Sequence, residues 1–188
     1  MDRRSWGRVA LAAGLAPWLG QVAPVAAQPP AVALLLLEPG RVDGAVTLDF
    51  ALRVALPAPV EDALRRGIAL HFRAEAALYR PRWYWRDERV GRARRRWRLT
   101  YQPLSNSFRV STGALHQSYA SLPEAMSAIT RISRWPVADA AAVDPSEDHY
   151  LEFSWRLDTG ELPRPMQIGI GNLPEWQLEV ERRIELPR

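Results

Sequence analysis

The segment Leu78–Tyr101, LYRPRWYWRDERVGRARRRWRLTY, sets the pattern of the whole sequence. It holds nine arginines and six aromatic residues but only two acidic residues, Asp87 and Glu88. In its second half, arginine alternates with the residues Ala93, Arg95, Trp97, Leu99 and Tyr101. A period of two residues is typical of a β-strand with one face toward the core. We therefore predict a strand that carries a row of arginines on its outer face.

The first half of this segment is predicted to be a second strand. Pro81 bends the chain at its start because proline cannot donate a hydrogen bond to a sheet. Trp83 and Trp85 then share one face, and Tyr84 lies on the other. Gly91 allows a turn or a bulge between the two predicted strands.

Alternating apolar residues predict further strands on both sides of this segment. They fall at 46–56 and 68–78 before it, and at 108–112, 151–157 and 176–186 after it. A turn is expected at Glu38–Gly40 and a hairpin turn at Asp43-Gly44. Two short helices are expected, one after Pro57 and one from the capping-box residue Ser121 to about Arg134. The fold class is α+β: mainly antiparallel β-sheet, sandwich-like, with two short helices.

Length and composition limit the possible functions. The 188 residues, 47% hydrophobic, suffice for one domain with a proper core. All 25 basic residues are arginine, which excludes a lysine Schiff base, a Ser–Lys dyad and a P-loop lysine. The chain has no cysteine, which excludes thiol nucleophiles, cysteine-ligated zinc and disulfides.

Charge is segregated along the chain. The formal net charge is +4, yet residues 71–100 carry ten arginines against three acidic residues, a local charge of +7. The rest of the chain is correspondingly acidic. A polarised surface of this kind matters more for the choice of partner than the isoelectric point does.

Residues 1–27 have the three parts of a secretory signal. The basic start consists of Arg3, Arg4 and Arg8. The apolar run Val9–Leu19 is interrupted by Pro17 and followed by Gly20, so it is short of the ~20 residues that a membrane-spanning helix needs. We expect cleavage after Ala27 and one exported domain over residues 28–188, periplasmic or secreted, without a transmembrane segment.

No arrangement of residues predicts an enzyme. His71, His116 and His149 fall on separate elements without metal-ligand spacing, so we expect no metal and no cofactor. Ser111 or Ser118 could be combined with His116 and an acid into a triad, but no nucleophile-elbow sequence supports this. An unrecognised hydrolase stays the third alternative for the function.

The arginines and aromatic rings of the central segment are the candidate binding surface. Guanidinium groups bind phosphates and carboxylates, and they stack on flat rings. The candidate residues are Arg80, Arg82, Tyr84, Arg86, Arg92, Arg94, Arg96 and Arg98. Outside the cytoplasm we expect no nucleic acid, but an envelope protein or an anionic lipid headgroup. In the purely structural alternative, the tryptophan rings are core and the arginines are solvated or paired with Glu179, Glu181 and Glu185.

Several runs of the sequence resemble a known family. They are Ala77–Glu88, Leu99–Leu104, Arg109–Gly113, Leu115–Tyr119 and Trp135–Ala138. On these runs the chain resembles domain-of-unknown-function family 4390, exported bacterial proteins without an established activity. The resemblance implies an exported domain, and, by analogy with genes next to membrane sensor kinases of the nitrogen-regulation type, a sensing partner.

These observations give two leading functions. The first is a non-enzymatic periplasmic or secreted interaction protein that presents the arginine- and aromatic-rich strand pair to an envelope protein, such as a sensor kinase. The second is a binder or carrier of an anionic lipid or amphiphile in a pocket of the sheet.

Overall fold

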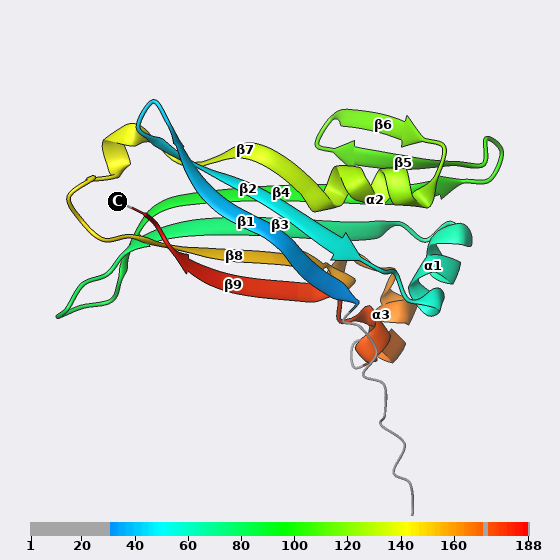
Figure 1. The fold of residues 1–188 in the computed structure, drawn as a ribbon. Helices are drawn as coiled ribbons and strands as arrows, with labels where there is room; N and C mark the ends of the chain where they lie inside the picture. The colour runs from blue at the N-terminus through cyan, green and yellow to red at the C-terminus, as the bar shows by residue number, and fades with distance from the viewer. Residues whose placement is uncertain (1–30, 171–172, 188) are drawn as a thin grey trace, which may run out of the picture.

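The computed structural model describes residues 31–170 and 173–187, which form two antiparallel sheets (Figure 1). The predicted export signal, residues 1–27, lies outside the described residues. The smaller sheet has the order β1–β2–β7, with β1 Val32–Val42, β2 Ala45–Val54 and β7 Arg131–Ala138. The larger sheet has the order β6–β5–β4–β3–β8–β9. Its strands are β3 Leu70–Arg80, β4 Glu88–Gln102, β5 Ser107–Thr112, β6 Leu115–Tyr119, β8 Tyr150–Leu157 and β9 Glu179–Glu185.

Short helices connect the strands. They are α1 Ala58–Arg65, α2 Leu122–Thr130 and α3 Arg164–Ile170, with the 3₁₀ turns η1 Ala140–Ala142, η2 Thr159–Glu161 and η3 Pro174–Trp176. The predicted class, α+β with mainly antiparallel sheet, is confirmed. The helix α3 was not predicted, because Pro163 precedes it and Pro165 lies in its first turn. Proline is nevertheless well tolerated in the first turn of a helix, where no N–H bond is lost.

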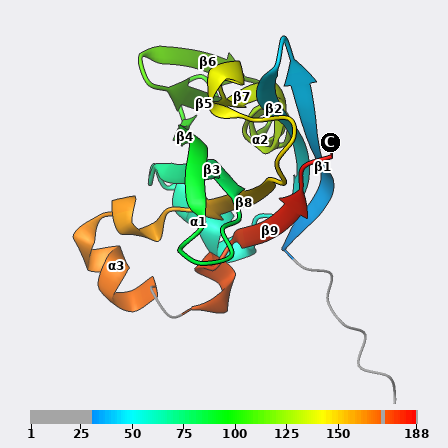
Figure 2. The same cartoon turned by 90° about the vertical axis from the view of Figure 1, so that its left-hand side faces the viewer.

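The core lies between the two sheets. Figure 2 looks along the strands and shows the smaller sheet facing one side of the larger one. The predicted alternation in β2 is confirmed, since Leu48, Phe50 and Leu52 are all buried. Phe50 packs on Phe153 of β8, with ring centroids 4.9 Å apart, and so joins the two sheets. The face of the larger sheet that points away from this core is consequently left at the surface.

Two local predictions were wrong. The turn expected at Glu38–Gly40 is absent, and β1 runs through it to Val42. Pro39 is accommodated because β1 is an edge strand of the smaller sheet, where a missing N–H interrupts no ladder. The second helix ends at Thr130 rather than near Arg134, although Ser121 does accept the predicted capping hydrogen bond from the Glu124 N–H (3.4 Å).

The β3–β4 hairpin projects beyond the rest of the fold, at the left of Figure 1. At Gly91, β4 passes close to β7. A Cβ at this position would lie 2.5 Å from the Cβ of Ala138, so the close approach requires glycine. A register shift follows, between Leu78 and Tyr79 of β3. Of the two predicted alternatives at Gly91, a turn or a bulge, the bulge is found, within β4 rather than between two strands. The strand predicted around Trp83–Trp85 is wrong: β3 ends at Arg80 and β4 starts at Glu88, so residues 81–87 form the turn of the hairpin.

Candidate functional site

The outer face of the larger sheet carries the predicted row of arginines. Arg92, Arg94, Arg96 and Arg98 are exposed on β4, and Trp97 and Leu99, on the opposite side, are buried. The bulge has a consequence for Arg89, which pairs with Tyr79 and so stays on this outer face. The predicted orientation of the strand is therefore confirmed.

Two arginines of this row share one acidic partner within the sheet. Arg92 forms an ion pair with Glu75 of β3, and Arg94 donates to the same carboxylate at 3.0 Å. In the structural alternative, the arginines were solvated or paired with Glu179, Glu181 and Glu185, and of these two possibilities the pairing is wrong. Those residues belong to β9, and β3 and β8 lie between β4 and β9.

The other two arginines of the row, Arg96 and Arg98, lie near further arginines on the neighbouring strands. Arg96 lies opposite Arg73 of β3, and Arg73 lies opposite Arg156 of β8. One acidic contact reaches this set among the residues the structure describes, from Asp158 to Arg73 at 3.6 Å. We call Arg73, Arg96, Arg98 and Arg156 the arginine cluster. Like charges on directly opposed strands are unfavourable. On the other side of Arg156, Glu179 of β9 lies opposite it.

A depression of about 420 Å³ lies within the arginine cluster. Its polar lining includes His71, Arg73, Arg96, Arg98, Ser111, Asp158 and Glu161. Burial lowers the pKa of His71, and the nearby guanidinium of Arg98 lowers it further, against the opposing effects of Glu161 and Asp158. The imidazole is therefore neutral at pH 7. Its Nδ1 atom is buried without a hydrogen-bond partner among the described residues.

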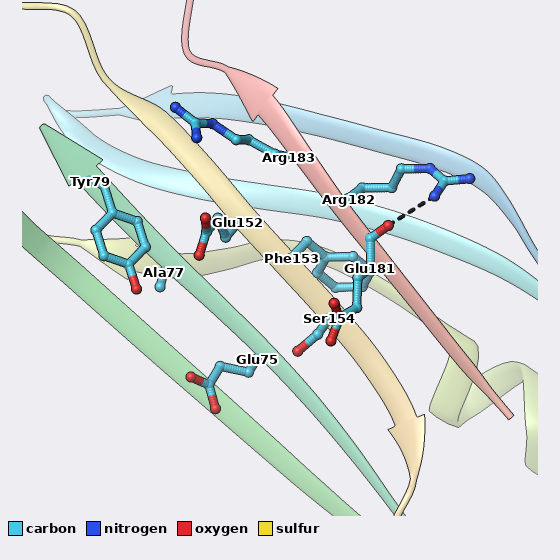
Figure 3. Close-up of a pocket in the computed structure, with 9 residues that line it drawn as sticks. All are labelled: Glu75, Ala77, Tyr79, Glu152, Phe153, Ser154, Glu181, Arg182 and Arg183. Carbon is cyan, nitrogen blue, oxygen red and sulfur yellow. Dashed lines mark hydrogen bonds between the residues drawn. The ribbon is translucent and has the colours of Figure 1, made fainter. Parts of the chain in front are cut away.

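A second depression, of about 360 Å³, lies further along the same face (Figure 3). The small side chains of Ala77 and Ser154 leave this space open between the larger residues around them. Glu75 and Glu152 line it, and Arg183 extends beside it from β9. The outer face is thus polarised, with arginines along β4 and acidic side chains toward β9.

The neck of the hairpin is held by ion pairs. Arg80 binds Glu88 and, at 2.5 Å, Glu147. Arg82 binds the same Glu88 carboxylate. Hydrogen bonds from Arg80 hold the pKa of Glu88 below its usual value. Arg80 and Arg82, both predicted to bind a partner, are thus already engaged within the protein.

Aromatic stacking fixes the hairpin against β8. Tyr150 stacks on Tyr79 at 5.3 Å between centroids, and the guanidinium of Arg183 lies 3.4 Å from the centre of the Tyr150 ring. The hydroxyl of Tyr150 donates to Asp87 at 2.6 Å, and the backbone N–H of Arg82 donates to the same carboxylate at 3.2 Å. Burial, followed by this hydrogen bond to Asp87, raises the pKa of Tyr150 to about 12.

The turn itself exposes three consecutive aromatic residues. Trp83 is 95% exposed, Tyr84 66% and Trp85 74%, and Arg86 beside them is exposed as well. The prediction that Trp83 and Trp85 share a core-facing side of a strand is wrong. We call residues 83–86 the hairpin tip. The eight candidate residues thus divide into the neck (Arg80, Arg82), the tip (Tyr84, Arg86), the pair bound to Glu75 (Arg92, Arg94) and half of the arginine cluster (Arg96, Arg98).

The remaining polar candidates do not come together. His149 is buried, with Nδ1 at 3.0 Å from the carbonyl oxygen of Glu147. His116 lies opposite Ser111 in the β5–β6 register, yet no hydrogen bond joins these two described side chains. Within residues 31–170 and 173–187, no group of three or more histidine, cysteine or acidic side chains could hold a metal ion.

Sequence reasoning missed half of the arginine cluster. The alternation of residues 68–78 puts Arg73 on the outer face, together with His71 and Glu75. From this pattern alone, Arg73 is expected to be an ordinary solvent-facing residue. Its importance comes from the register, which sets Arg73 between Arg96 and Arg156. No local pattern gives the register of strands so far apart in the sequence.

Comparison with known proteins assigns the chain to a family. No helix in the described part of the chain has both the length and the apolar character needed to cross a bilayer. No curated protein and no solved structure matches the chain. Residues 32–185 match the family described as Domain of unknown function (DUF4390), and this match covers every strand of both sheets. The chain therefore belongs to the DUF4390 family.

Proposed function

We propose that this chain is an exported, non-enzymatic interaction protein that binds an acidic surface of an envelope protein through the arginine cluster. The observation that carries this proposal is the row of like charges Arg96, Arg73 and Arg156 across three adjacent strands. Such a row weakens the isolated sheet, so a negative partner would relieve it. Carboxylates suit this role because each guanidinium offers them two parallel N–H donors.

The position of the cluster supports a protein partner. It lies on the open face of a sheet, where an approaching surface meets several arginines at once. Arg92 and Arg94, in contrast, already share Glu75, whereas Arg96 and Arg98 form no ion pair with a described residue and lie beside Arg73. The family resemblance makes the exported region of a membrane sensor kinase the first partner to test.

The second predicted function, a carrier of an anionic amphiphile, has weaker support. The two depressions on the outer face, of about 420 and 360 Å³, have many charged residues in their linings. A carrier would instead need an apolar cavity for the hydrocarbon chain. A surface contact fits these linings better than an enclosed lipid does.

A crosslinking capture from the native envelope tests the proposal. The variant Arg96→Ser/Arg98→Ser should lose most of the captured partner, and the capture by the wild type should weaken as salt is raised. The matched control is Arg41→Ser/Arg53→Ser, which removes the same charge from exposed positions of the smaller sheet. Both variants should unfold within about 0.5 kcal/mol of the wild type, because exposed arginines contribute little to stability.

Two results would contradict the proposal. One is equal capture by the cluster variant and the control, which would place the contact elsewhere. The other is that the wild type captures no envelope protein at all.

A further inference from the structure

The hairpin tip carries an inference that is independent of the arginine cluster. Trp83, Tyr84 and Trp85 expose three consecutive aromatic rings, which is a large apolar area at one extremity of the molecule. Soluble proteins rarely leave such a patch uncovered unless it is an interaction site. Trp83 and Tyr84 contact each other edge to face, with centroids 5.1 Å apart, but neither ring is buried in the body of the protein.

The exposure of the rings does not come from a loose loop. Arg80 and Arg82 close the neck through Glu88, and Glu147 holds Arg80 from the loop before β8. Asp87 anchors the end of the turn to Tyr150. The scaffold therefore fixes the base of the turn while it leaves the rings outside.

Arginines and acidic residues are equal in number at this end, since Arg80, Arg82, Arg86 and Arg89 lie near Asp87, Glu88, Glu147 and Asp148, but they differ in how they are engaged. The carboxylates of Asp87, Glu88 and Glu147 are all engaged by hydrogen bonds or ion pairs within the neck. Arg86 and Arg89, on either side of these acids, are exposed and form no ion pair with a described residue. The tip thus presents aromatic rings and free guanidinium groups together.

We infer that the hairpin tip inserts into the interfacial layer of an anionic phospholipid bilayer. Tryptophan and tyrosine favour this layer because the ring enters the apolar region while the N–H or O–H group reaches water. The guanidinium groups of Arg86 in the tip and of Arg89 next to it, at the start of β4, would bind lipid phosphates.

The shape of the tip favours a bilayer over a protein pocket. The Trp83 and Tyr84 rings lie at 70° to each other, so they do not form one flat apolar surface. A fluid interface accepts rings in several orientations. A protein pocket, in contrast, requires one complementary shape around a central anchor.

Insertion of the tip leaves the arginine cluster free. Along β3, Tyr79 at the neck and His71 beside the cluster are eight residues apart in the strand, or roughly 26 Å at the usual rise per residue. A bilayer contact at the tip and a protein contact at the cluster are therefore compatible, and the first does not depend on the second.

Vesicle flotation of the purified chain tests the inference. The chain should float with vesicles of phosphatidylglycerol and phosphatidylcholine in equal parts, and much less with phosphatidylcholine alone. Trp83→Ser/Trp85→Ser should weaken the binding at least about tenfold, because membrane affinity scales with the apolar area inserted. The matched control is Leu104→Ser/Ile168→Ser, which removes two exposed apolar side chains outside the tip and should bind like the wild type.

A second pair of variants separates charge from insertion. Arg86→Ser/Arg89→Ser should reduce binding to anionic vesicles and remove most of its salt dependence, whereas Arg41→Ser/Arg53→Ser should retain both. Bilayers with brominated acyl chains should quench wild-type tryptophan fluorescence more than that of Trp83→Ser/Trp85→Ser. Since the tryptophans are replaced at exposed positions, circular dichroism should show an unchanged fold.

Three outcomes would overturn the inference. The first is a wild-type chain that does not float with anionic vesicles. The second is equal flotation of Trp83→Ser/Trp85→Ser and its control. The third is capture of an envelope protein that depends on Trp83 and Trp85 while the vesicles bind neither chain, which would assign the tip to a protein partner.

Discussion

Trp97 and Trp83 belong to the same β3–β4 hairpin but have opposite surroundings. Trp97 lies in the body of β4 and is 4% exposed, whereas Trp83 lies in the turn and is 95% exposed. Both come from the arginine-rich segment, and each has arginine near it in the sequence. Residue type and local composition therefore do not separate a core tryptophan from a surface one.

The difference arises from what lies opposite each residue. Trp97 pairs with Phe72 of β3, and the side chains of both strands point between the two sheets. Beyond Gly91 the hairpin extends past the second sheet, so that the tip has nothing to pack against. The body of the hairpin thus serves stability, and we propose that the tip serves binding.

The largest effect is expected from replacing the two tryptophans separately. Trp97→Ala should lower the free energy of unfolding by about 3–5 kcal/mol, because it leaves a cavity in the core. Trp83→Ala should change it by less than about 0.5 kcal/mol, since the ring makes no core contact. Urea unfolding measures both values. A large loss for Trp83→Ala would mean that the tip folds back onto the body, and the comparison would fail.

A smaller effect is expected at the boundary between the two regions. Gly91→Ala should destabilise the protein by about 1–3 kcal/mol, because the new Cβ would meet Ala138 at 2.5 Å and the carbonyl oxygen of Val137 at 2.6 Å. Gly169→Ala is the control, since no atom lies within 4 Å of its added Cβ and alanine favours its helix. If both variants have the same stability, β7 does not approach β4 as closely as described.

The smallest effect concerns the anchoring of the tip and depends on pH. The hydrogen bond from Tyr150, followed by that from the Arg82 N–H, holds the pKa of Asp87 below its usual value. A depressed carboxyl pKa stabilises the fold above the unfolded value, about 4, and this stabilisation is lost as the pH falls through the folded value. The tip should therefore stay anchored at neutral pH and be released only in acid.

The carboxyl chemical shift of Asp87 measures this titration by NMR. Tyr150→Phe should move the pKa of Asp87 upward, toward its usual value. Tyr101→Phe is the matched control: it removes a hydroxyl that bonds Asn106 at the other end of β4, and should leave Asp87 unchanged. An unchanged pKa in Tyr150→Phe would show that the hydroxyl does not hold the tip.

Much of the fold could be predicted because its strands have one buried face. The alternation in β2 and β8 predicted both the strands and their inward residues, such as Phe50 and Phe153. The same rule failed at Trp83 and Trp85, where the alternation is accidental and Pro81 marks the end of a strand rather than the start of one. A pattern of only four residues cannot tell a strand from a turn that exposes the same residue types.

The candidate site could be predicted only in part. The sequence placed Arg96 and Arg98 on an outer face, and this was correct. It could not tell that Glu75 would form ion pairs with Arg92 and Arg94, because that depends on the register of β3 against β4. For the same reason, it assigned the acidic partners to the wrong strand.

By itself, the sequence determined the antiparallel character of this protein, its family and the inward and outward faces of its main strands. These follow from local periodicity and composition, which act over a few neighbouring residues. The tertiary structure alone decided which arginines have an acidic partner, which lie side by side, and that the hairpin carries its aromatic residues beyond the core. These features depend on strand register and on where each sheet ends, and both are fixed by packing between residues far apart in the chain.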